Sequence, residues 1–359
     1  MTNIVQLSVP SQRLPDPIRQ AALMQSFALH RRFGDDVFWL KENAELLNIL
    51  ESTDAKVDPS GLAAYAGFYR DVEKRIQFFP QYYRFLLSIC LDLEDLGMPG
   101  NKAESLVHWA AKQGLAEAEL SDLQRMEARR LMARRGVDPL PQDGGLNDRM
   151  RAFMARSATF SMPNKKAAYE LTHAVFYLSR YGRQDPELCG QSRDSLEFVG
   201  LLAYLEQNAD LLAEVCIALA HGGFDVPDAW SDWLVRHTQM FAVETGEAAS
   251  TQDDYHEFLV CNWMLATTGH RPFVKPLVTQ RLCFCRGDGA AGPLRELSGC
   301  RYQLDEKRAP DWTSMRPVVL DHLSDNARSV VTQAESSCTN FNAFFEGFAR
   351  AGAVTGALS

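Results

Sequence analysis

The sequence predicts an all-α fold of stacked α-hairpins, arranged as an α/α repeat-like array or a toroid. Apolar, often aromatic runs end at glycine in four places, at residues 84–97, 170–182, 211–223 and 258–269. Such a run cannot bury its apolar face alone, so neighbouring runs must pack around a shared core. The alternation of strands and helices that βαβ units require is absent, which argues against a dinucleotide-binding sheet.

The order of elements follows from helix start and stop signals. Residues 1–18 hold three prolines and predict an extended N-terminal arm, and residues 19–359 then form one helical domain. Ser60 is the expected cap of the second helix. In the first part of the chain helices are expected at 17–48 with a break near 34–36, from Ser60 onward, after Pro80 up to 97, at 101–114 and at 121–135.

Residues 136–148 form the clearest break, with two prolines and three glycines. Such a segment is a domain linker or a long surface loop. We interpret it as a loop, because the apolar runs on both sides share the same glycine ends. A subdivision of the domain at this point stays open.

The second part of the chain is again helical, apart from one segment. Helices are expected at 163–182, 192–208, 209–221, 227–243, 252–268 and 316–351. Residues 278–304 have short alternating stretches around a glycine-rich turn, which predicts a β-hairpin or an irregular excursion. Four aromatic residues near the C-terminus should share one helix face, namely Phe341, Phe344, Phe345 and Phe348.

The composition and net charge of the chain limit the kinds of partner that it can bind. The chain has 359 residues, 46% of them hydrophobic, and a formal net charge of −9. A negative protein is a poor ligand for nucleic-acid phosphates, so we expect no nucleic-acid partner. The basic stretch 125–135, which includes Arg129, Arg130, Arg134 and Arg135, is interpreted as a solvated helix face.

The cellular location is inferred from two features that the sequence lacks, a secretory signal and a membrane-spanning segment. The first residues show no basic segment followed by an apolar core, and no stretch is apolar over the length that spans a bilayer. We therefore expect a cytoplasmic protein with no membrane partner. Eight cysteines spread over a long chain, several inside apolar runs, indicate reduced thiols rather than a disulfide framework.

His173 and His256 are the first candidate catalytic residues, with Tyr177 and Tyr255 beside them. Each histidine sits among apolar residues of a predicted helix, at the edge of a core. In one interpretation each imidazole only bonds a neighbouring carbonyl or carboxylate. In the other, both point into one aromatic-lined cavity, with Trp263, and carry protons or bind metal for a small-molecule ligand.

Asp253, Asp254 and Glu257 form the densest acidic site. Their spacing resembles the aspartate-rich motif with which class I terpene synthases hold magnesium, which implies a metal-dependent isoprenoid-type enzyme. The second metal-binding motif is not matched, since the nearest stretch, 325–335, has the wrong spacing. We favour the alternative that Thr251 caps a helix and the acids occupy its first turn.

Cys283, Cys285 and Cys300 are a second candidate metal site, with His270 as a possible fourth zinc ligand. The C-x-C spacing is tighter than the C-x₂₋₄-C pairs of structural zinc sites. We also place the first two thiols on opposite faces of a strand, which would prevent shared ligation. Half-buried thiols are therefore the favoured interpretation.

No sequence motif assigns a cofactor, because the phosphate-loop, nucleophile-elbow and zinc-helix motifs are missing. Residues 172–182 together with 253–265 resemble segments of poorly characterised bacterial helical proteins of the domain-of-unknown-function kind, which implies no activity.

The sequence thus favours a central small-molecule site, used for binding or for catalysis. The alternative is a non-enzymatic scaffold that presents a concave surface to a protein partner. Exposed side chains at Trp230, Trp233 or Trp312 would favour that scaffold. The magnesium-dependent enzyme is the third hypothesis.

Overall fold

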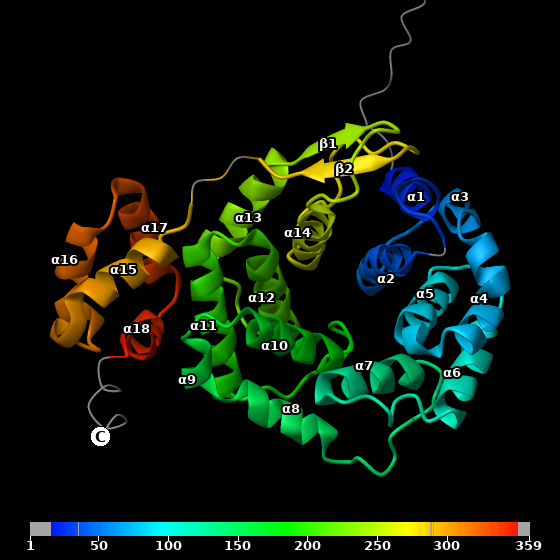
Figure 1. Cartoon of the computed structure of the whole chain (residues 1–359), viewed down its shortest axis with the longest axis horizontal. Helices are drawn as coiled ribbons and strands as arrows, with labels where there is room; N and C mark the ends of the chain where they lie inside the picture. Colours follow the sequence, from blue (N-terminus) through cyan, green and yellow to red (C-terminus); the bar gives the residue numbers. More distant parts are fainter. Residues whose placement is uncertain (1–15, 35, 288, 290, 351–359) are drawn as a thin grey trace, which may run out of the picture. The chain divides into compact units, whose positions relative to one another are not determined.

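The computed structural model describes residues 16–34, 36–287, 289 and 291–350. Within these residues the chain forms 18 α-helices and two short strands, which confirms the all-α prediction (Figure 1). Most of the expected N-terminal arm lies outside the described residues, but residues 16–18 already belong to the first helix. The repeat-like or toroidal arrangement stays a prediction.

The chain divides into two compact units, and each contains two separate stretches of sequence. Unit 1 comprises residues 1–142 and 239–287, and unit 2 comprises residues 143–238 and 288–359. The chain passes from unit 1 to unit 2 between residues 142 and 143, inside the proline- and glycine-rich stretch 136–148. It returns to unit 1 between residues 238 and 239 and leaves it again after residue 287.

Unit 1 consists of eight α-helices, short 3₁₀ and π segments, and the two strands. Its elements are α1 (Asp16–Ser26), the π-helix η2 (Phe27–Arg31), α2 (Val37–Ser52), α3 (Pro59–Ala63), α4 (Ala66–Phe78), η3 (Pro80–Tyr82), α5 (Tyr83–Asp95), α6 (Lys102–Lys112), α7 (Asp122–Ala133), β1 (Ala242–Thr245), α14 (Tyr255–Thr267) and β2 (Leu282–Cys285).

The core of unit 1 lies around α2 and α5. Helix α2 packs against α5 and α14, and α5 also contacts α4, α6 and α7. Asp36 caps α2 by accepting a hydrogen bond from the Phe38 amide. The predicted cap of α3 at Ser60 is wrong, because Asp58 is the cap and its carboxylate accepts from both the amide and the hydroxyl of Ser60.

The strand expected in 278–304 is present, but its partner lies elsewhere in the sequence. β2 pairs with β1 in an antiparallel sheet whose register sets Glu244 opposite Cys283 and Thr245 opposite Leu282. The segment is therefore no local hairpin, and its last part is helical. The sequence of one strand does not show which distant segment pairs with it. The sequence pattern therefore identified β2 but not its partner β1.

Unit 2 contains nine helices that lie wholly within it, and most of α13. Its elements are α8 (Leu146–Met154), α9 (Ser157–Phe160), α10 (Lys165–Leu178), α11 (Gly190–Glu206), α12 (Ala209–His221), α13 (Asp228–Met240), α15 (Leu294–Leu304), η4 (Asp305–Lys307), α16 (Trp312–His322), α17 (Asp325–Ser337) and α18 (Phe341–Ala349).

Helix α11 is the centre of unit 2 and packs against α12, α9, α15 and α17. A Cβ at Gly200 of this helix would overlap the indole of the buried Trp230, so the glycine lets that ring approach. The helical stretch expected over 316–351 contains the end of α16 followed by α17 and α18. Ser324 begins α17 by accepting from the Ala327 amide. The four phenylalanines of α18 that were predicted to share one helix face are all buried.

The four glycine-terminated runs are confirmed by backbone geometry. Gly97, Gly182, Gly223 and Gly269 follow α5, α10, α12 and α14, and all four have positive φ, between 73° and 108°. A left-handed residue after a helix turns the chain away at little cost only when it is glycine. The glycine signal therefore located the ends of α5, α12 and α14 within two residues, whereas α10 ends four residues before Gly182 and already has positive φ at Arg180 and Tyr181.

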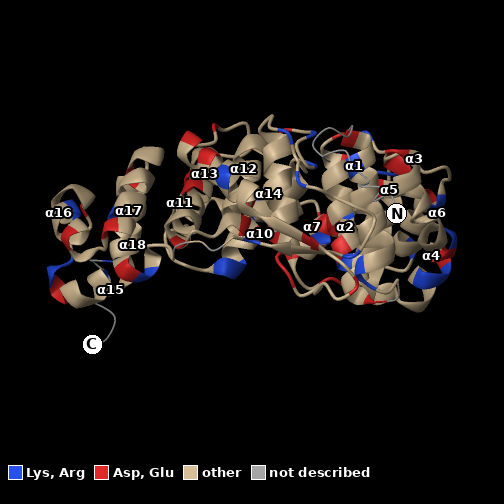
Figure 2. Ribbon diagram, turned by 90° about the horizontal axis from the view of Figure 1, so that it is seen from above, with Lys and Arg blue, Asp and Glu red and all other residues tan. Residues whose placement is uncertain are grey.

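The basic helix α7 does not present a solvated row of arginines. Arg130 is buried, Arg134 pairs with Asp92 at 2.6 Å, and Arg135 pairs with Glu94 at 3.0 Å. Both carboxylates belong to α5, so the charges link two helices. Figure 2 shows positive and negative residues interspersed along the ribbons. In the described residues no helix is both long and apolar enough to cross a bilayer.

Candidate functional site

A buried ion network in unit 1 connects three segments of sequence. Arg31, at the end of η2, has a side chain with no solvent exposure. Its Nε donates to Glu42 at 2.9 Å, and its two terminal nitrogens donate to the two oxygens of Asp253 at 2.8 and 3.0 Å. Both carboxylates are 1% exposed. Such pairs are stable in a dry interior only when geometry and hydrogen bonding are this complete.

Aromatic rings and a second arginine complete the network. The Arg31 guanidinium lies 5.0 to 5.3 Å from the ring centroids of Phe27, Tyr255 and Phe284. Arg32 donates to Glu42 at 2.9 Å, so two arginines balance the two carboxylates. Burial alone would lower the pKa of Arg31, but the hydrogen bonds and charges of the two carboxylates raise it.

The acidic segment before α14 attaches β2 to the rest of unit 1. Asp253 accepts from the Phe284 amide at 2.8 Å, and the Asp254 amide donates to the Phe284 carbonyl at 2.9 Å. Asp254 also accepts from the Arg286 amide at 3.0 Å, and Glu257 pairs with the Arg286 side chain at 3.5 Å. The three acids are thus engaged by arginines and by the open edge of β2, which does not support the magnesium hypothesis.

The expected cap at Thr251 is also corrected. Helix α14 begins at Tyr255, so the first two acids precede the helix and only Glu257 lies in its first turn. The Thr251 carbonyl instead accepts from Arg32 at 2.7 Å. The unpaired amides of a strand edge, the buried Arg31 and the exposed Arg286 attract these carboxylates more strongly than a helix terminus does.

Beside this network, Tyr255 and His256 meet a carboxylate that the sequence analysis missed. The Tyr255 hydroxyl donates to Glu45 at 3.0 Å, and Nε2 of His256 lies 3.8 Å from the same carboxylate. The Glu45 side chain is 25% exposed and that of His256 is 34% exposed. A second glutamate one turn after Glu42, within the apolar helix α2, was the signal that could have found it.

The protonation of this cluster follows from its surroundings. Burial raises the pKa of Glu45, although the charges of His256 and Lys41 and the Tyr255 hydrogen bond oppose the shift. Burial and the neighbouring glutamates also raise the pKa of Tyr255. The phenol therefore keeps its proton, and the carboxyl holds a proton more readily than an ordinary glutamate.

His173 lies in unit 2 and has a different carboxylate. Its Nδ1 is 2.8 Å from the Tyr169 carbonyl and 3.5 Å from Glu214. Because a carbonyl only accepts, Nδ1 carries the proton. The Thr172 hydroxyl donates to the same carboxylate at 2.6 Å. The rings of His173 and Tyr177 are in edge contact, with centroids 6.0 Å apart, so the two side chains lie on the same face of α10.

The two histidines belong to different compact units, and each has its own acidic neighbour. The cavity expected to hold both stays a prediction.

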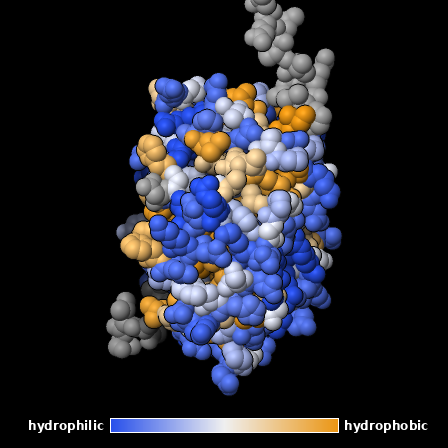
Figure 3. Space-filling model, turned by 90° about the vertical axis from the view of Figure 1, so that its right-hand side faces the viewer, coloured by the Kyte–Doolittle hydropathy of each residue, from blue (hydrophilic) through white to orange (hydrophobic). Residues whose placement is uncertain are grey.

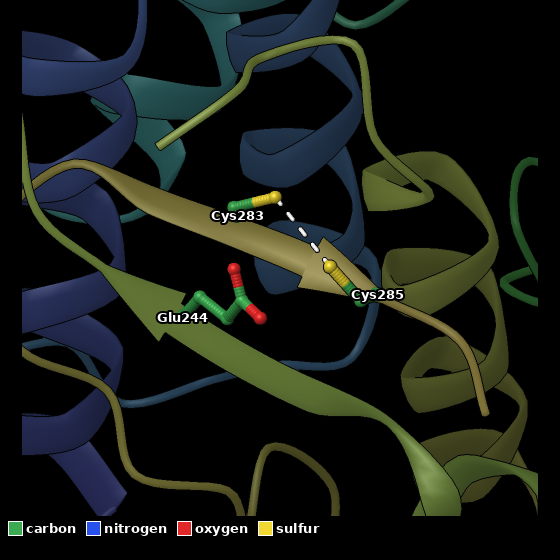
Figure 4. Close-up of side chains that lie close together, drawn as sticks. All are labelled: Glu244, Cys283 and Cys285. Atoms are coloured by element: carbon green, nitrogen blue, oxygen red, sulfur yellow. Dashed lines mark hydrogen bonds between the residues drawn. The ribbon is translucent and has the colours of Figure 1, made fainter. Parts of the chain in front are cut away.

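A separate cluster lies on the sheet. The Sγ atoms of Cys283 and Cys285 are 3.6 Å apart, and a carboxylate oxygen of Glu244 on β1 completes a group whose ligand atoms lie within 4.8 Å of one another (Figure 4). The expectation of opposite faces was wrong, because residues two apart in a strand share a face. Cys300 lies on α15 in unit 2, and neither it nor His270 belongs to this group among the described residues.

The comparisons with known proteins concern nearly the whole chain. Residues 1–351 match the family model described as a domain of unknown function, DUF6902. The chain belongs to the DUF6902 family. The matched residues include both segments, 172–182 and 253–265, that resemble bacterial helical proteins with a domain of unknown function. No curated protein and no solved structure shows significant similarity to this DUF6902 chain.

The geometry of the DUF6902 chain does not provide the tryptophans expected of a scaffold. Trp230 and Trp312 are buried, and Trp233 is half-buried with its ring stacked on His237. The face seen in Figure 3 is mostly hydrophilic, and hydrophobic side chains form small groups on it.

Unit 1 also has an open hollow of about 700 Å³. Its described lining residues are Leu29, His30, Gly246, Glu247, Gln280 and Arg281. They do not include Glu45, Tyr255 or His256, so the group formed by these three side chains is separate from the hollow.

Proposed function

We propose that this DUF6902 protein acts on a small molecule by general acid–base chemistry at Glu45, Tyr255 and His256. The observation that carries the proposal is a half-buried carboxyl group with a raised pKa, placed between a phenol and an imidazole. Titratable groups with shifted pKa values and partial access to solvent are more frequent at functional sites than elsewhere.

Each side chain has a distinct part in this proposal. Glu45 is the group that exchanges the proton, because burial favours its protonated form. Tyr255 stays protonated and orients the carboxyl through its 3.0 Å hydrogen bond. The His256 imidazole, one-third exposed, passes the proton between Glu45 and the ligand. The reaction class is proton transfer to or from a polar substrate.

The ion network supports this arrangement. Asp253 holds the chain directly before Tyr255, and Glu42 lies one turn before Glu45 on α2. Both carboxylates bind the same Arg31 guanidinium, so the two segments that supply the proposed site are fixed against each other within unit 1. Catalytic groups need support of this kind, because a misplacement of about 1 Å can cost a hundredfold in rate.

The test is an unbiased search for turnover. Purified full-length protein is incubated with a cell metabolite extract, and compounds that fall or rise are followed by mass spectrometry. We expect the wild type to convert a compound, and Glu45→Gln and His256→Gln to lose that conversion by at least about a hundredfold. His173→Gln is the matched control and should keep it. Conversion that survives in Glu45→Gln, or no conversion by the wild type, would reject the proposal.

A further inference from the structure

We propose that Cys283, Cys285 and Glu244 bind a zinc ion on the sheet of unit 1. The site is independent of the acid–base cluster and shares no residue with it. It differs from the sequence-based zinc hypothesis in its third ligand, since a carboxylate of β1 takes the place of Cys300.

The strand register builds this site. Cys283 and Cys285 alternate with Leu282 and Phe284, whose side chains are fully buried. Both thiols therefore lie together on the opposite face of β2. Glu244 stands directly across from Cys283 in the antiparallel pair, so its side chain is on the same face as the thiols.

The distances match a tetrahedral zinc site. Zinc–sulfur bonds of about 2.3 Å place two sulfurs of a tetrahedron about 3.8 Å apart, and the observed Sγ separation is 3.6 Å. The carboxylate lies within 4.8 Å of both sulfurs and needs to approach to about 3.5 Å. Glu244 is exposed, so rotation of its flexible side chain can supply that movement.

Charge and pairing distinguish this carboxylate from the other acids nearby. Asp253, Asp254 and Glu257 are engaged by arginines or strand amides. Within the described residues the Glu244 carboxylate has no hydrogen bond or ion pair, and the only side-chain hydrogen bond of the free Cys285 thiol is with the Cys283 thiol. The side chains that remain available to bind a metal here are therefore Glu244, Cys283 and Cys285, and these three lie close together.

The ligand chemistry selects the metal. Two thiolates and one carboxylate favour a borderline-soft cation such as zinc, whereas magnesium and calcium prefer oxygen ligands alone. In the described part of the chain three protein ligands converge. A fourth position then falls to water or to an exogenous ligand, as in zinc sites that do chemistry rather than only hold a fold.

The test measures zinc directly. Full-length protein is reduced, purified without a metal-affinity tag, stripped by chelator and titrated with zinc, with bound metal counted by plasma mass spectrometry. Cobalt is the spectroscopic probe, since thiolate ligation gives a charge-transfer band. We expect one zinc per chain and a thermal midpoint that rises when zinc binds.

Variants identify the ligands. Cys285→Ser should weaken zinc binding by at least about 100-fold and reduce the intensity of the cobalt–thiolate band, because one thiolate of two remains, and Glu244→Gln should weaken zinc binding by about 10- to 100-fold. Cys300→Ser and the exposed Cys189→Ser are controls and should bind as the wild type does. Unchanged melting of metal-free Cys285→Ser verifies that the fold is intact.

Three results would overturn the assignment. They are a wild type that takes up no zinc at micromolar concentration, a Cys285→Ser variant that binds zinc at wild-type affinity, and equal loss of zinc in Cys300→Ser.

Discussion

Each compact unit places a histidine beside a carboxylate, and the two pairs differ in how deeply the carboxylate is buried. In unit 2 the Glu214 side chain is 3% exposed and receives a short hydrogen bond from Thr172, while the His173 Nδ1 proton is directed at a backbone carbonyl. In unit 1 Glu45 is 25% exposed, and Nε2 of His256 faces it. The carboxylate of the first pair is buried in the helix packing, and the carboxylate of the second is partly exposed to solvent.

The difference depends on what surrounds each carboxylate. In unit 1 the buried charges of Arg31, Glu42 and Asp253 pair with one another in a separate network. Glu45 is not part of that network and can therefore gain or lose a proton. In unit 2 the buried Glu214 itself is the acceptor for Thr172. A carboxylate that anchors a core is a poor proton carrier, because its ionised form is already committed to hydrogen bonds.

The largest expected effect is on the network that supports the unit 1 pair. Arg31→Met leaves the buried Asp253 without a counter-charge and Glu42 with Arg32 alone, so we expect a loss of about 3–5 kcal/mol in the free energy of unfolding. Urea denaturation followed by circular dichroism measures it. The control Arg70→Met removes an exposed arginine and should change stability by less than about 0.5 kcal/mol. Similar values for both variants would mean that the network is not a support.

The unit 2 pair is tested by removing one hydroxyl. Thr172→Val keeps the side-chain shape but takes the 2.6 Å hydrogen bond from the buried Glu214, and we expect a loss of about 1–3 kcal/mol in the same denaturation experiment. Thr332→Val is the matched control, because that exposed hydroxyl bonds only its own helix at the Arg328 carbonyl. If the two variants are equally stable, Glu214 does not depend on Thr172.

The smallest effect is the pH dependence of the unit 1 pair. Because the fold raises the pKa of Glu45, its contribution to stability is complete below the pKa of the unfolded state and is lost as pH rises through the folded pKa. Between acidic and neutral pH the wild type should therefore lose stability relative to Glu45→Gln. The loss is about 1.4 kcal/mol for each tenfold difference between the acid dissociation constants of the folded and unfolded states. Thermal melts of both proteins from pH 4 to pH 8 give this difference.

A second substitution sharpens that test. The Tyr255 hydrogen bond lowers the pKa of Glu45, so Tyr255→Phe should raise it further and increase the loss of stability toward neutral pH. A pH profile that is the same in wild type, Tyr255→Phe and Glu45→Gln would show that Glu45 does not titrate in this range.

Part of the candidate site could be predicted from sequence. Tyr255 and His256 stood out because polar residues in an apolar helix need a partner, but Glu45 lies more than 200 positions away and nothing local links it to them. The C-x-C pair was visible in the sequence, whereas its carboxylate neighbour depends on which strand pairs with β2 and in which register. Partners supplied by distant segments have no local signature.

The sequence by itself determined the helical class of this protein and the ends of several of its helices. Apolar periodicity and the glycines at 97, 182, 223 and 269 act over a few residues, so they work in any tertiary context. The tertiary structure decided which groups the charged side chains pair with. The acids at 253, 254 and 257 suit a metal or a helix cap equally well by spacing, and the buried Arg31 and the open edge of β2 bind the first two instead. The reason is that desolvation makes a buried charge seek whichever partner the fold brings close, and only the fold sets that distance.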